Sequence, residues 1–365
     1  MPKPLRVGLV GASPERGWAQ ISHVPAIHGV NGVELAGVTG STQAKADAAA
    51  DVFGAKRGFA DVLSMAQHPD IDLITIAVRV PAHRELVEQA LAHGKHVYCE
   101  WPLGRNVAEA EALAKAADEA GVHAAIGLQA RLNPALARAR ALVSSGALGR
   151  VLSARVYSGT VAFGPEIGEA DSYLEDAASG ATLATIHGGH ALDAAIAVLG
   201  PFVDIACLAT IQHPHITVTD GGRSIQRQSS DHLLSIARLA AGGGALSIEV
   251  DGGRPADDTH FRFEVTGEGG GLALRGGAIR GFQSGRLALS LNGRDQVVDE
   301  SEATGMPDAA ANVASVYAAL RDDIQNNTRV TPDFDHAVGL SRLVAAMTEA
   351  ADTGRSSVQS GWPGR

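Results

Sequence analysis

The sequence predicts two domains: an α/β N-terminal domain with a doubly wound parallel sheet, and an α+β C-terminal domain with an open, mostly antiparallel sheet. Over the first 130 residues, short apolar runs alternate with alanine-rich helical stretches, a pattern typical of a parallel sheet covered on both faces. After Gly149, longer stretches alternate apolar with polar residues between glycine-rich turns, as antiparallel strands do. Because 365 residues are ample for two cores, we divide the chain into domains 1–130 and 131–365.

In the N-terminal domain, each expected strand is an apolar run and each expected helix has apolar residues three or four positions apart. Gly94 and Gly121 follow two of the helices, where the left-handed conformation of glycine commonly ends a helix. The expected strands are Leu5–Val10, Val33–Val38, Leu73–Val78, His96–Cys99 and Ala124–Leu128, and the expected helices are Ala44–Phe53, Phe59–Gln67, Ala82–His93 and Val107–Ala120.

The C-terminal domain is predicted to be mainly strands, with one helical insertion at about Leu183–Leu199. Two closing helices, within about residues 308–351, are expected to pack back on the body of the protein. The clearest strands are Val151–Val156, Leu233–Leu239, Ala245–Val250 and Phe261–Thr266, and the closing helices are Asp308–Ile324 and Asp335–Ala351.

The composition argues against several classes of protein. A net charge of −10, with no run of Lys or Arg, argues against a nucleic-acid partner. No apolar run reaches the ~20 residues of a membrane span, and the strand-like Leu5–Val10 leaves no room for a signal peptide. Cys99 and Cys207 follow no metal-binding or disulfide-dense pattern, as expected in the reduced cytosol. We therefore expect a cytoplasmic protein that contacts neither nucleic acid nor membrane.

A glycine-rich turn follows the first strand, in "GLVGASPERGWAQ". Gly8, Gly11 and Gly17 are placed where backbone amides and a helix N-terminus can hold a pyrophosphate. The usual G-x-G-x-x-G spacing is not intact, because Ser13 occupies the place of the second glycine. The alternative is an ordinary tight turn between strand and helix, but its position in the first βαβ unit favours a dinucleotide site.

The end of the second strand bears on the choice of cofactor. Dinucleotide folds commonly place a carboxylate there, against the adenosine ribose. This chain instead has Ser41 and Thr42, followed by Lys45. Small hydroxyl groups and a cation could accept a 2′-phosphate, so we expect NADP, or NAD as well. The alternative is that this surface turn carries no information on the cofactor.

Three further motifs, in this order, resemble the Gfo/Idh/MocA family of nicotinamide-dependent sugar and cyclitol oxidoreductases. "AHGKHVYCEWPL" is similar to the family's A-G-K-H-V-x-x-E-K-P element, "GHALD" (189–193) to its H-x-x-D element, and "TPDFDHAVGLSRLVAAMTEAADTG" to its closing helix. The resemblance covers nearly the whole chain. It implies a Rossmann domain that binds NAD(P) and a second domain that binds a sugar or polyol.

Within that family, the chain resembles a subgroup that includes the fungal galactose-regulon repressor. The residues that carry this likeness are Gly11-x-Ser13, Gly17-Trp18-Ala19, His23-x-Pro25-Ala26-Ile27, "EWPL" and "GLQAR". That regulator is a dehydrogenase fold used as a nucleotide-binding sensor, so the likeness implies the fold and the dinucleotide site more firmly than it implies catalysis.

The family's usual catalytic groups are a lysine, an aspartate and a histidine, and only the histidine is present. Trp101 occupies the lysine position and Ile186 the aspartate position, whereas His190 is retained. An imidazole, with an unperturbed pKa near ~6.5, suits a general base. His187 and Asp193 share its helical face at a spacing of three, so we assign substrate binding to His187 and the orientation of His190 to Asp193. The alternatives are polar groups bracing an interface, and a metal site, for which the spacing lacks a further donor; we expect no metal.

Trp101 offers one N–H donor and a large flat face, which suits stacking on a pyranose or the nicotinamide; plain core packing is the alternative. Arg131 and Tyr157 are further substrate candidates, Arg131 with a structural salt bridge as an equal alternative. The remaining cofactor residues are assigned by their positions after the strands or in the resembling motifs: Trp18, Val78, Arg79, Val80, His83, Glu100, Trp101 and Gln129.

These features predict an NAD(P)-dependent oxidoreductase that transfers a hydride between the nicotinamide and a sugar or polyol, with His190 as base. The alternative is a non-catalytic regulatory or binding protein that senses dinucleotide and sugar on the same fold. The resemblance also implies that the outer face of the second sheet is an oligomer surface, so we expect a homodimer or homotetramer.

Overall fold

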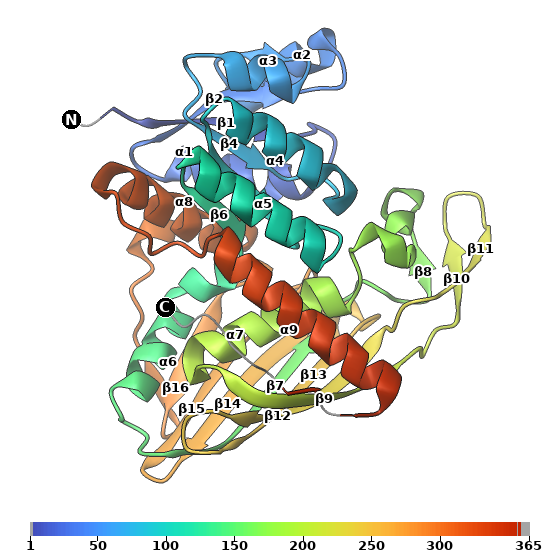
Figure 1. Ribbon diagram of the computed structural model, residues 1–365, viewed down its shortest axis with the longest axis vertical. Helices are drawn as coiled ribbons and strands as arrows, with labels where there is room; N and C mark the ends of the chain where they lie inside the picture. Colours follow the sequence, from blue (N-terminus) through green and yellow to red (C-terminus); the bar gives the residue numbers. More distant parts are fainter. Residues whose placement is uncertain (1–2, 356, 359–365) are drawn as a thin grey trace. The chain divides into compact units, whose positions relative to one another are not determined.

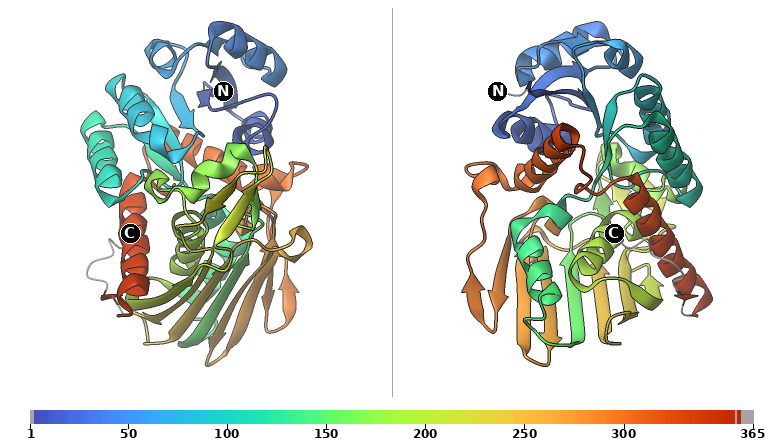
Figure 2. Two further views of the ribbon diagram at one scale, coloured as in Figure 1. Left: turned by 90° about the vertical axis from the view of Figure 1, so that its right-hand side faces the viewer. Right: turned by 60° about the vertical axis from the view of Figure 1, so that its left-hand side comes forward.

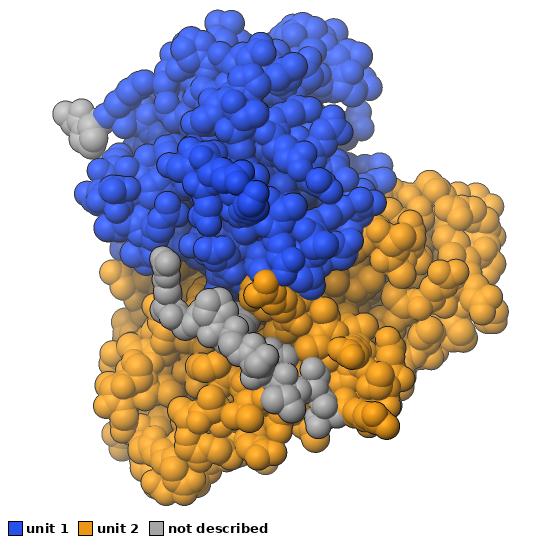
Figure 3. Space-filling model, in the orientation of Figure 1, with its two compact units in different colours: residues 1–129, 300–338 blue, residues 130–299, 339–365 orange. Residues whose placement is uncertain are grey.

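The computed structural model describes residues 3–355 and 357–358. The chain forms two compact units (Figure 3). Unit 1 comprises residues 1–129 and 300–338, and unit 2 comprises residues 130–299 and 339–365. Among the described residues, no helix has the length and apolar character needed to cross a membrane.

Unit 1 contains a six-stranded parallel sheet in the order β3-β2-β1-β4-β5-β6 (Figure 1). This order places β1 beside β4 at the centre, which is the dinucleotide-binding arrangement of the doubly wound class. The strands are almost wholly buried, as expected of a sheet covered on both faces. The strands are β1 (Leu5–Val10), β2 (Val33–Thr39), β3 (Gly58–Phe59), β4 (Leu73–Ile76), β5 (His96–Glu100) and β6 (Ala124–Gly127).

The helices of unit 1 begin and end at the expected kinds of residue. Asn106 caps the start of α5 by accepting a hydrogen bond from the amide of Glu109, and Gly121 ends that helix with φ of 65°. The helices are the π-helix η1 (Ala19–His23), α1 (Val24–Gly29), α2 (Gln43–Phe53), α3 (Val62–Gln67), η2 (Val80–Ala82), α4 (His83–Ala92), α5 (Val107–Ala120), η9 (Ser301–Ala303) and α8 (Asp308–Asn326).

The closing segment is divided between the units, which differs from the expected division of the chain at residue 130. Residues 300–338, with α8, belong to unit 1, because α8 packs against η1, α1, β2 and β6. Its buried face includes Val313, Val316 and Tyr317. The last helix, α9 (Phe334–Thr353), begins in unit 1 and continues in unit 2. Sequence position alone does not reveal this return to the first sheet.

Unit 2 contains a nine-stranded mixed sheet in the order β17-β16-β15-β14-β7-β13-β12-β9-β18 (Figures 1 and 2). Only the central pair, β7 and β13, is parallel, and all the other pairs are antiparallel. The strands are β7 (Val151–Gly159), β9 (Phe202–Thr210), β12 (His232–Leu239), β13 (Ala245–Asp251), β14 (His260–Gly267), β15 (Gly270–Gly277), β16 (Leu287–Leu291), β17 (Arg294–Gln296) and β18 (Ser357–Val358).

Helices cover one face of this sheet. Every residue of α7 (Gly189–Leu199) is buried, as expected of a helix that is apolar on all sides, and α7 packs on β7, β13 and α6. The other face is open and exposes Leu208, Leu234 and Ile236. The remaining elements are η3 (Gln129–Leu132), α6 (Pro134–Ser144), η4 (Glu169–Glu175), η5 (Ala177–Ser179), the π-helix η6 (Ala184–Gly188), η7 (Ala256–Asp258), η8 (Phe282–Ser284), and a small sheet of β8 (Glu166–Ile167), β10 (His215–Val218) and β11 (Ser224–Gln226).

A buried arginine, Arg227, connects the segment after β11 of the small sheet to three other segments of unit 2. The side chain of Arg227 is 0% exposed and donates to Glu175 at 2.8 Å and to Asp231 at 2.7 Å. It also donates to the carbonyl oxygens of Phe163 and Gly164. One guanidinium therefore holds together the segment after β7, the end of η4 and the start of β12.

Candidate functional site

The residues expected to bind a cofactor lie along one edge of the unit 1 sheet. Because the strands are parallel, their carboxyl ends lie on the same side, where ligands of open α/β sheets bind. We call this the carboxyl edge. It comprises the segments that follow β1, β2, β4, β5 and β6, at residues 11–18, 40–45, 77–83, 101–104 and 128–129.

The turn after β1 requires glycine. Gly11 has φ of +95°, and a Cβ atom there would lie 2.4 Å from the carbonyl oxygen of Ala77. Gly17 has φ of +126° with open space around it. Gly8 corrects the expectation, because it lies inside β1 and its missing side chain accommodates Met65 of α3. Gly11 and Gly17 thus shape the turn, whereas Gly8 serves strand–helix packing.

The helix after this turn begins with the π-helix η1, a geometry that is common at functional sites. Trp18 immediately precedes η1, and its Nε1–H is buried without a hydrogen-bond partner among the described residues. The same holds for Oε1 of Gln129, which follows β6. Buried polar groups without partners are rare, and these two lie in the segments expected to bind the cofactor. Their chemistry fits a ligand with both hydrogen-bond donors and acceptors, as a dinucleotide has.

The turn after β2 is exposed and carries no carboxylate. Thr42 caps α2, with its side chain accepting a hydrogen bond from the amide of Lys45 at 3.3 Å. Ser41 and Lys45 are exposed. The first carboxylate after β2, that of Asp47, accepts a hydrogen bond from Gln43. The groups available at this turn are therefore hydroxyls, amides and one ammonium.

His83 was expected to bind the cofactor, but its ring is buried between two backbone segments. The ring is 1% exposed and lies between two carbonyl oxygens, at 2.9 Å from that of Pro102 and 3.0 Å from that of Val78. Burial lowers the pKa of this imidazole, and the two carbonyl contacts oppose that effect. A neutral imidazole has one N–H, so His83 donates to one of these two carbonyl oxygens, and its ring lies between the segment after β4 and the segment after β5. The neighbouring Arg79 is exposed.

A buried chain of hydrogen bonds, which sequence reasoning missed, ends at Glu100. His23 contacts Glu100 Oε1 through Nε2 at 3.0 Å and the Tyr317 hydroxyl through Nδ1 at 2.8 Å. That hydroxyl lies 2.9 Å from Thr75 Oγ1. A Cβ atom at Gly127 would lie 2.9 Å from Glu100 Oε1, so the carboxylate is confined on that side also.

This chain fixes Glu100 at the end of β5, beside the residue in the family's lysine position. That residue, Trp101, is 6% exposed, and its peptide bond to Pro102 is cis. The sequence does not signal this contact of His23, which lies two residues before Pro25 at the start of α1. Only the fold brings His23 and Tyr317 next to Glu100.

In unit 2, the expected catalytic residues lie where η6 passes into α7. His187 belongs to η6, and His190 and Asp193 belong to the first turns of α7. All three are buried. Burial lowers the pKa of His187 to about 3, with a further contribution from His190. His187 is therefore neutral at ordinary pH, and its Nδ1 lacks a hydrogen-bond partner among the described residues.

Asp193 is paired with Arg131. Arg131 Nη1 donates to Asp193 Oδ1 at 2.8 Å, and the side chains are 17% and 2% exposed. A structural salt bridge was one of the two roles expected for Arg131. The carboxylate expected to orient His190 thus also holds a cation beside α7.

Tyr157 does not lie with the histidines, contrary to expectation. Successive side chains of a strand point to opposite faces, and Val156 is buried on the face where α7 packs. Tyr157 therefore projects from the open face, where its ring stacks on His260 at 4.8 Å and its hydroxyl donates to Asp251 at 3.4 Å. The alternation of side chains between the two faces along β7 already indicated that Tyr157 and Val156 lie on opposite faces.

Two family descriptions match successive parts of the chain. Residues 5–128 match the oxidoreductase family with an NAD-binding Rossmann fold, Gfo/Idh/MocA. Residues 134–276 match the C-terminal domain of Gal80p. The chain thus has a Rossmann domain of the Gfo/Idh/MocA type, followed by a C-terminal domain of the Gal80p type.

Proteins that are similar to this chain include both dehydrogenases and regulators. The dehydrogenase AclE of Aspergillus oryzae is 29% identical over 97% of this chain and 98% of its own length. The galactose/lactose metabolism regulatory protein GAL80 of Saccharomyces cerevisiae is 28% identical over 75% of this chain and 67% of its own. A solved structure of levoglucosan dehydrogenase with NADH and levoglucosan shares the fold, with a TM-score of 0.83, 20% identity and coverage of 98% and 100%.

Proposed function

We propose that the protein is an NAD(P)-dependent oxidoreductase that transfers a hydride between the nicotinamide and a hydroxyl or carbonyl group of a sugar or polyol. The observation that carries this proposal is the carboxyl edge, where Gly11 and Gly17 shape the turn before a helix and Trp18 and Gln129 present unpartnered polar atoms. The dehydrogenase relative that matches nearly the whole chain supports catalysis. The complex of levoglucosan dehydrogenase supports a sugar as the substrate class.

In the proposed reaction, His190 takes the proton of a substrate hydroxyl while the hydride on the same carbon leaves, so that a carbonyl forms. The nicotinamide supplies the hydride acceptor when it is bound. His187 is neutral, so its unpartnered Nδ1 can bind a substrate oxygen without competing for the proton. Asp193 and Arg131 form an ion pair beside the start of α7. In the reverse direction, the same imidazole returns the proton to the oxygen.

The second candidate function is a regulatory protein that binds dinucleotide and sugar without turnover. Trp101 and Ile186 favour it, because they replace the two other polar groups of the family's usual site. The regulatory relative GAL80 favours it also. The two functions share the cofactor site, so cofactor binding tests the common part of both.

Adding NADP or NAD to the protein is expected to raise its thermal unfolding midpoint, because a ligand that binds only the folded state stabilises it. NADP should bind at least as tightly as NAD, because hydroxyls and Lys45, rather than a carboxylate, follow β2. Thermal-shift titrations with both cofactors measure this. No shift at millimolar concentrations of either would overturn the cofactor site.

The variant Lys45→Ala tests the choice between the cofactors. Removal of this ammonium should weaken NADP and leave NAD nearly unchanged, since only NADP carries a 2′-phosphate. Lys56→Ala is the matched control, because Lys56 is also exposed on unit 1 but pairs with Glu34 at 2.7 Å. Equal affinities for NADP in wild type and Lys45→Ala would show that Lys45, in the turn after β2, does not bind the 2′-phosphate.

We also propose that the open face of the unit 2 sheet is the surface through which copies of the chain form a homodimer or homotetramer. Leu208, Leu234 and Ile236 are 58%, 41% and 64% exposed on this face. Leu234 lies directly opposite Leu208 in the pairing of β12 with β9. Neighbouring exposed apolar side chains of this kind mark interaction surfaces.

A further inference from the structure

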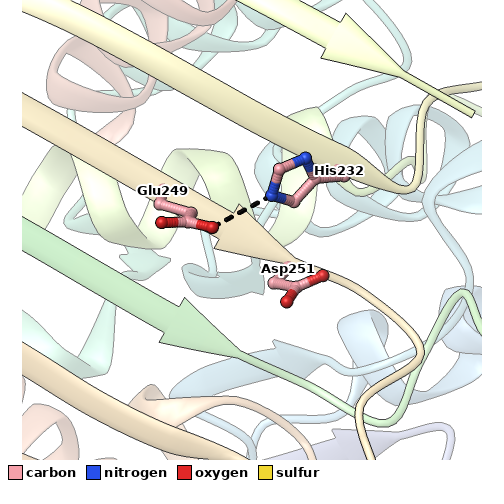
Figure 4. Close-up of side chains that lie close together, drawn as sticks. All are labelled: His232, Glu249 and Asp251. Atoms are coloured by element: carbon pink, nitrogen blue, oxygen red, sulfur yellow. Dashed lines mark hydrogen bonds and ion pairs between the residues drawn. The ribbon is translucent and has the colours of Figure 1, made fainter. Parts of the chain in front are cut away.

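One end of the open face carries three side chains of the types that bind metal ions. His232 lies on β12, and Glu249 and Asp251 lie on β13 (Figure 4). His232 is directly opposite Asp251 in the antiparallel pairing, and Glu249 is two residues away on the same face. We call these three residues the β12–β13 cluster. Its members come from two neighbouring strands, so the backbone already holds them together.

The distances within the β12–β13 cluster are close to those of a coordination shell. One donor atom from each of the three residues lies within 4.8 Å of the others, and His232 Nε2 is 3.1 Å from Glu249 Oε1. Metal–ligand bonds of ~2.1 Å in a tetrahedral arrangement separate neighbouring donor atoms by roughly 3.4 Å. The His232–Glu249 pair is already close to this separation. Small side-chain rotations would bring the Asp251 carboxylate to a similar distance from the other two donor atoms.

The surroundings of the cluster leave an excess of negative charge. Arg254 lies 3.5 Å from Asp251, but its closest partner is Asp258. His260 in turn contacts Asp258 at 3.0 Å. The carboxylates of Glu249, Asp251 and Asp258 outnumber the single guanidinium of Arg254 by two, an excess of negative charge that a divalent cation would balance.

The cluster is shielded yet accessible. In a single chain, the side chains of His232 and Asp251 are 13% and 11% exposed, whereas that of Glu249 is 41% exposed. Tyr157 donates to Asp251 from β7.

We propose that the β12–β13 cluster binds one divalent transition-metal ion of the Zn²⁺ class through His232, Glu249 and Asp251. One imidazole nitrogen and two carboxylate oxygens suit Zn²⁺, with water as the fourth ligand. Mg²⁺ and Ca²⁺ prefer oxygen donors throughout. The ion would fasten the start of β12 to the end of β13. The proposal is independent of the proposed oxidoreductase activity, since the cluster lies on the face opposite α7.

Calorimetric titration of the untagged, chelator-treated full chain with ZnCl₂ tests the proposal. We expect one Zn²⁺ per chain with a micromolar or lower Kd, much weaker binding of Mg²⁺, and a higher thermal midpoint with Zn²⁺. His232→Ala, Glu249→Gln and Asp251→Asn should each weaken Zn²⁺ by at least ~10- to 100-fold, the range seen when even supporting residues of metal sites are changed.

His215→Asn is the matched control, because His215 is exposed on β10 and lies outside the cluster. It should leave the affinity for Zn²⁺ unchanged. The proposal is overturned if Zn²⁺ fails to bind at micromolar concentrations, or if Mg²⁺ binds equally well. It is also overturned if the three cluster variants bind Zn²⁺ as tightly as the control, which would place the ion elsewhere.

Discussion

Replacing His190 by alanine is expected to lower kcat for the best sugar by ~100- to 10,000-fold, with a much smaller change in KM. A positioned general base typically supplies an acceleration of this size. His190 is the one group of the family's usual three that this chain retains, and the fold places it at the start of α7. Steady-state kinetics of the purified variant, with circular dichroism to confirm folding, measure the effect.

The comparison with His187→Ala separates the two histidines. Because His187 is neutral, with its pKa lowered to about 3, we assign it to substrate binding, and its loss should raise KM more than it lowers kcat. His190→Gln keeps most of the side-chain volume and should fold even where alanine leaves a cavity. Near-normal kcat in the glutamine variant would remove His190 from the role of base.

Replacing Arg227 by methionine is expected to lower the free energy of unfolding of unit 2 by about 3–5 kcal/mol, the usual cost of removing one partner from a buried ion pair. The guanidinium is fully buried between Glu175 and Asp231. Its removal leaves two buried carboxylates without their cation. Urea unfolding followed by hydrogen exchange, which resolves the two units separately, measures the loss.

Arg223→Met is the matched control. Arg223 also pairs with a carboxylate, that of Glu169, but both side chains are about half exposed. Exposed ion pairs contribute little because water and salt screen them, so this variant should unfold almost as wild type does. Similar losses in the two variants would mean that the buried network contributes no more than a surface pair.

Most of the fold was predictable because hydrophobic periodicity follows burial. The strands and helices of the first sheet lie within a few residues of their expected positions. A helix was expected after the glycine turn, but its bounds, Ala19 to Gly29, were not located, because the histidine- and proline-containing sequence shows no clear helical stripe. The two-residue strand β3 was absorbed into the expected helix at Phe59–Gln67. The assignment of α8 to unit 1 depends on tertiary packing, which local sequence does not encode.

The candidate site was less predictable, because side-chain direction and distant partners decide it. The glycine turn and the histidine helix could be located by motif. The ring of His83 is engaged by two backbone carbonyls, and no sequence pattern signals such an arrangement. Tyr157 could have been placed correctly from the alternation along its strand. The β12–β13 cluster joins residues 17 positions apart, which strand register alone brings together.

Turnover by the wild-type protein tests most directly whether this chain transfers hydride. The measurement is the absorbance of reduced nicotinamide while the protein is incubated with NADP or NAD and a panel of aldoses, glycosides and cyclitols. We expect slow but measurable turnover of at least one sugar, lost in His190→Ala. Tight cofactor binding without hydride transfer to or from any member of the panel would contradict it and favour the regulatory function.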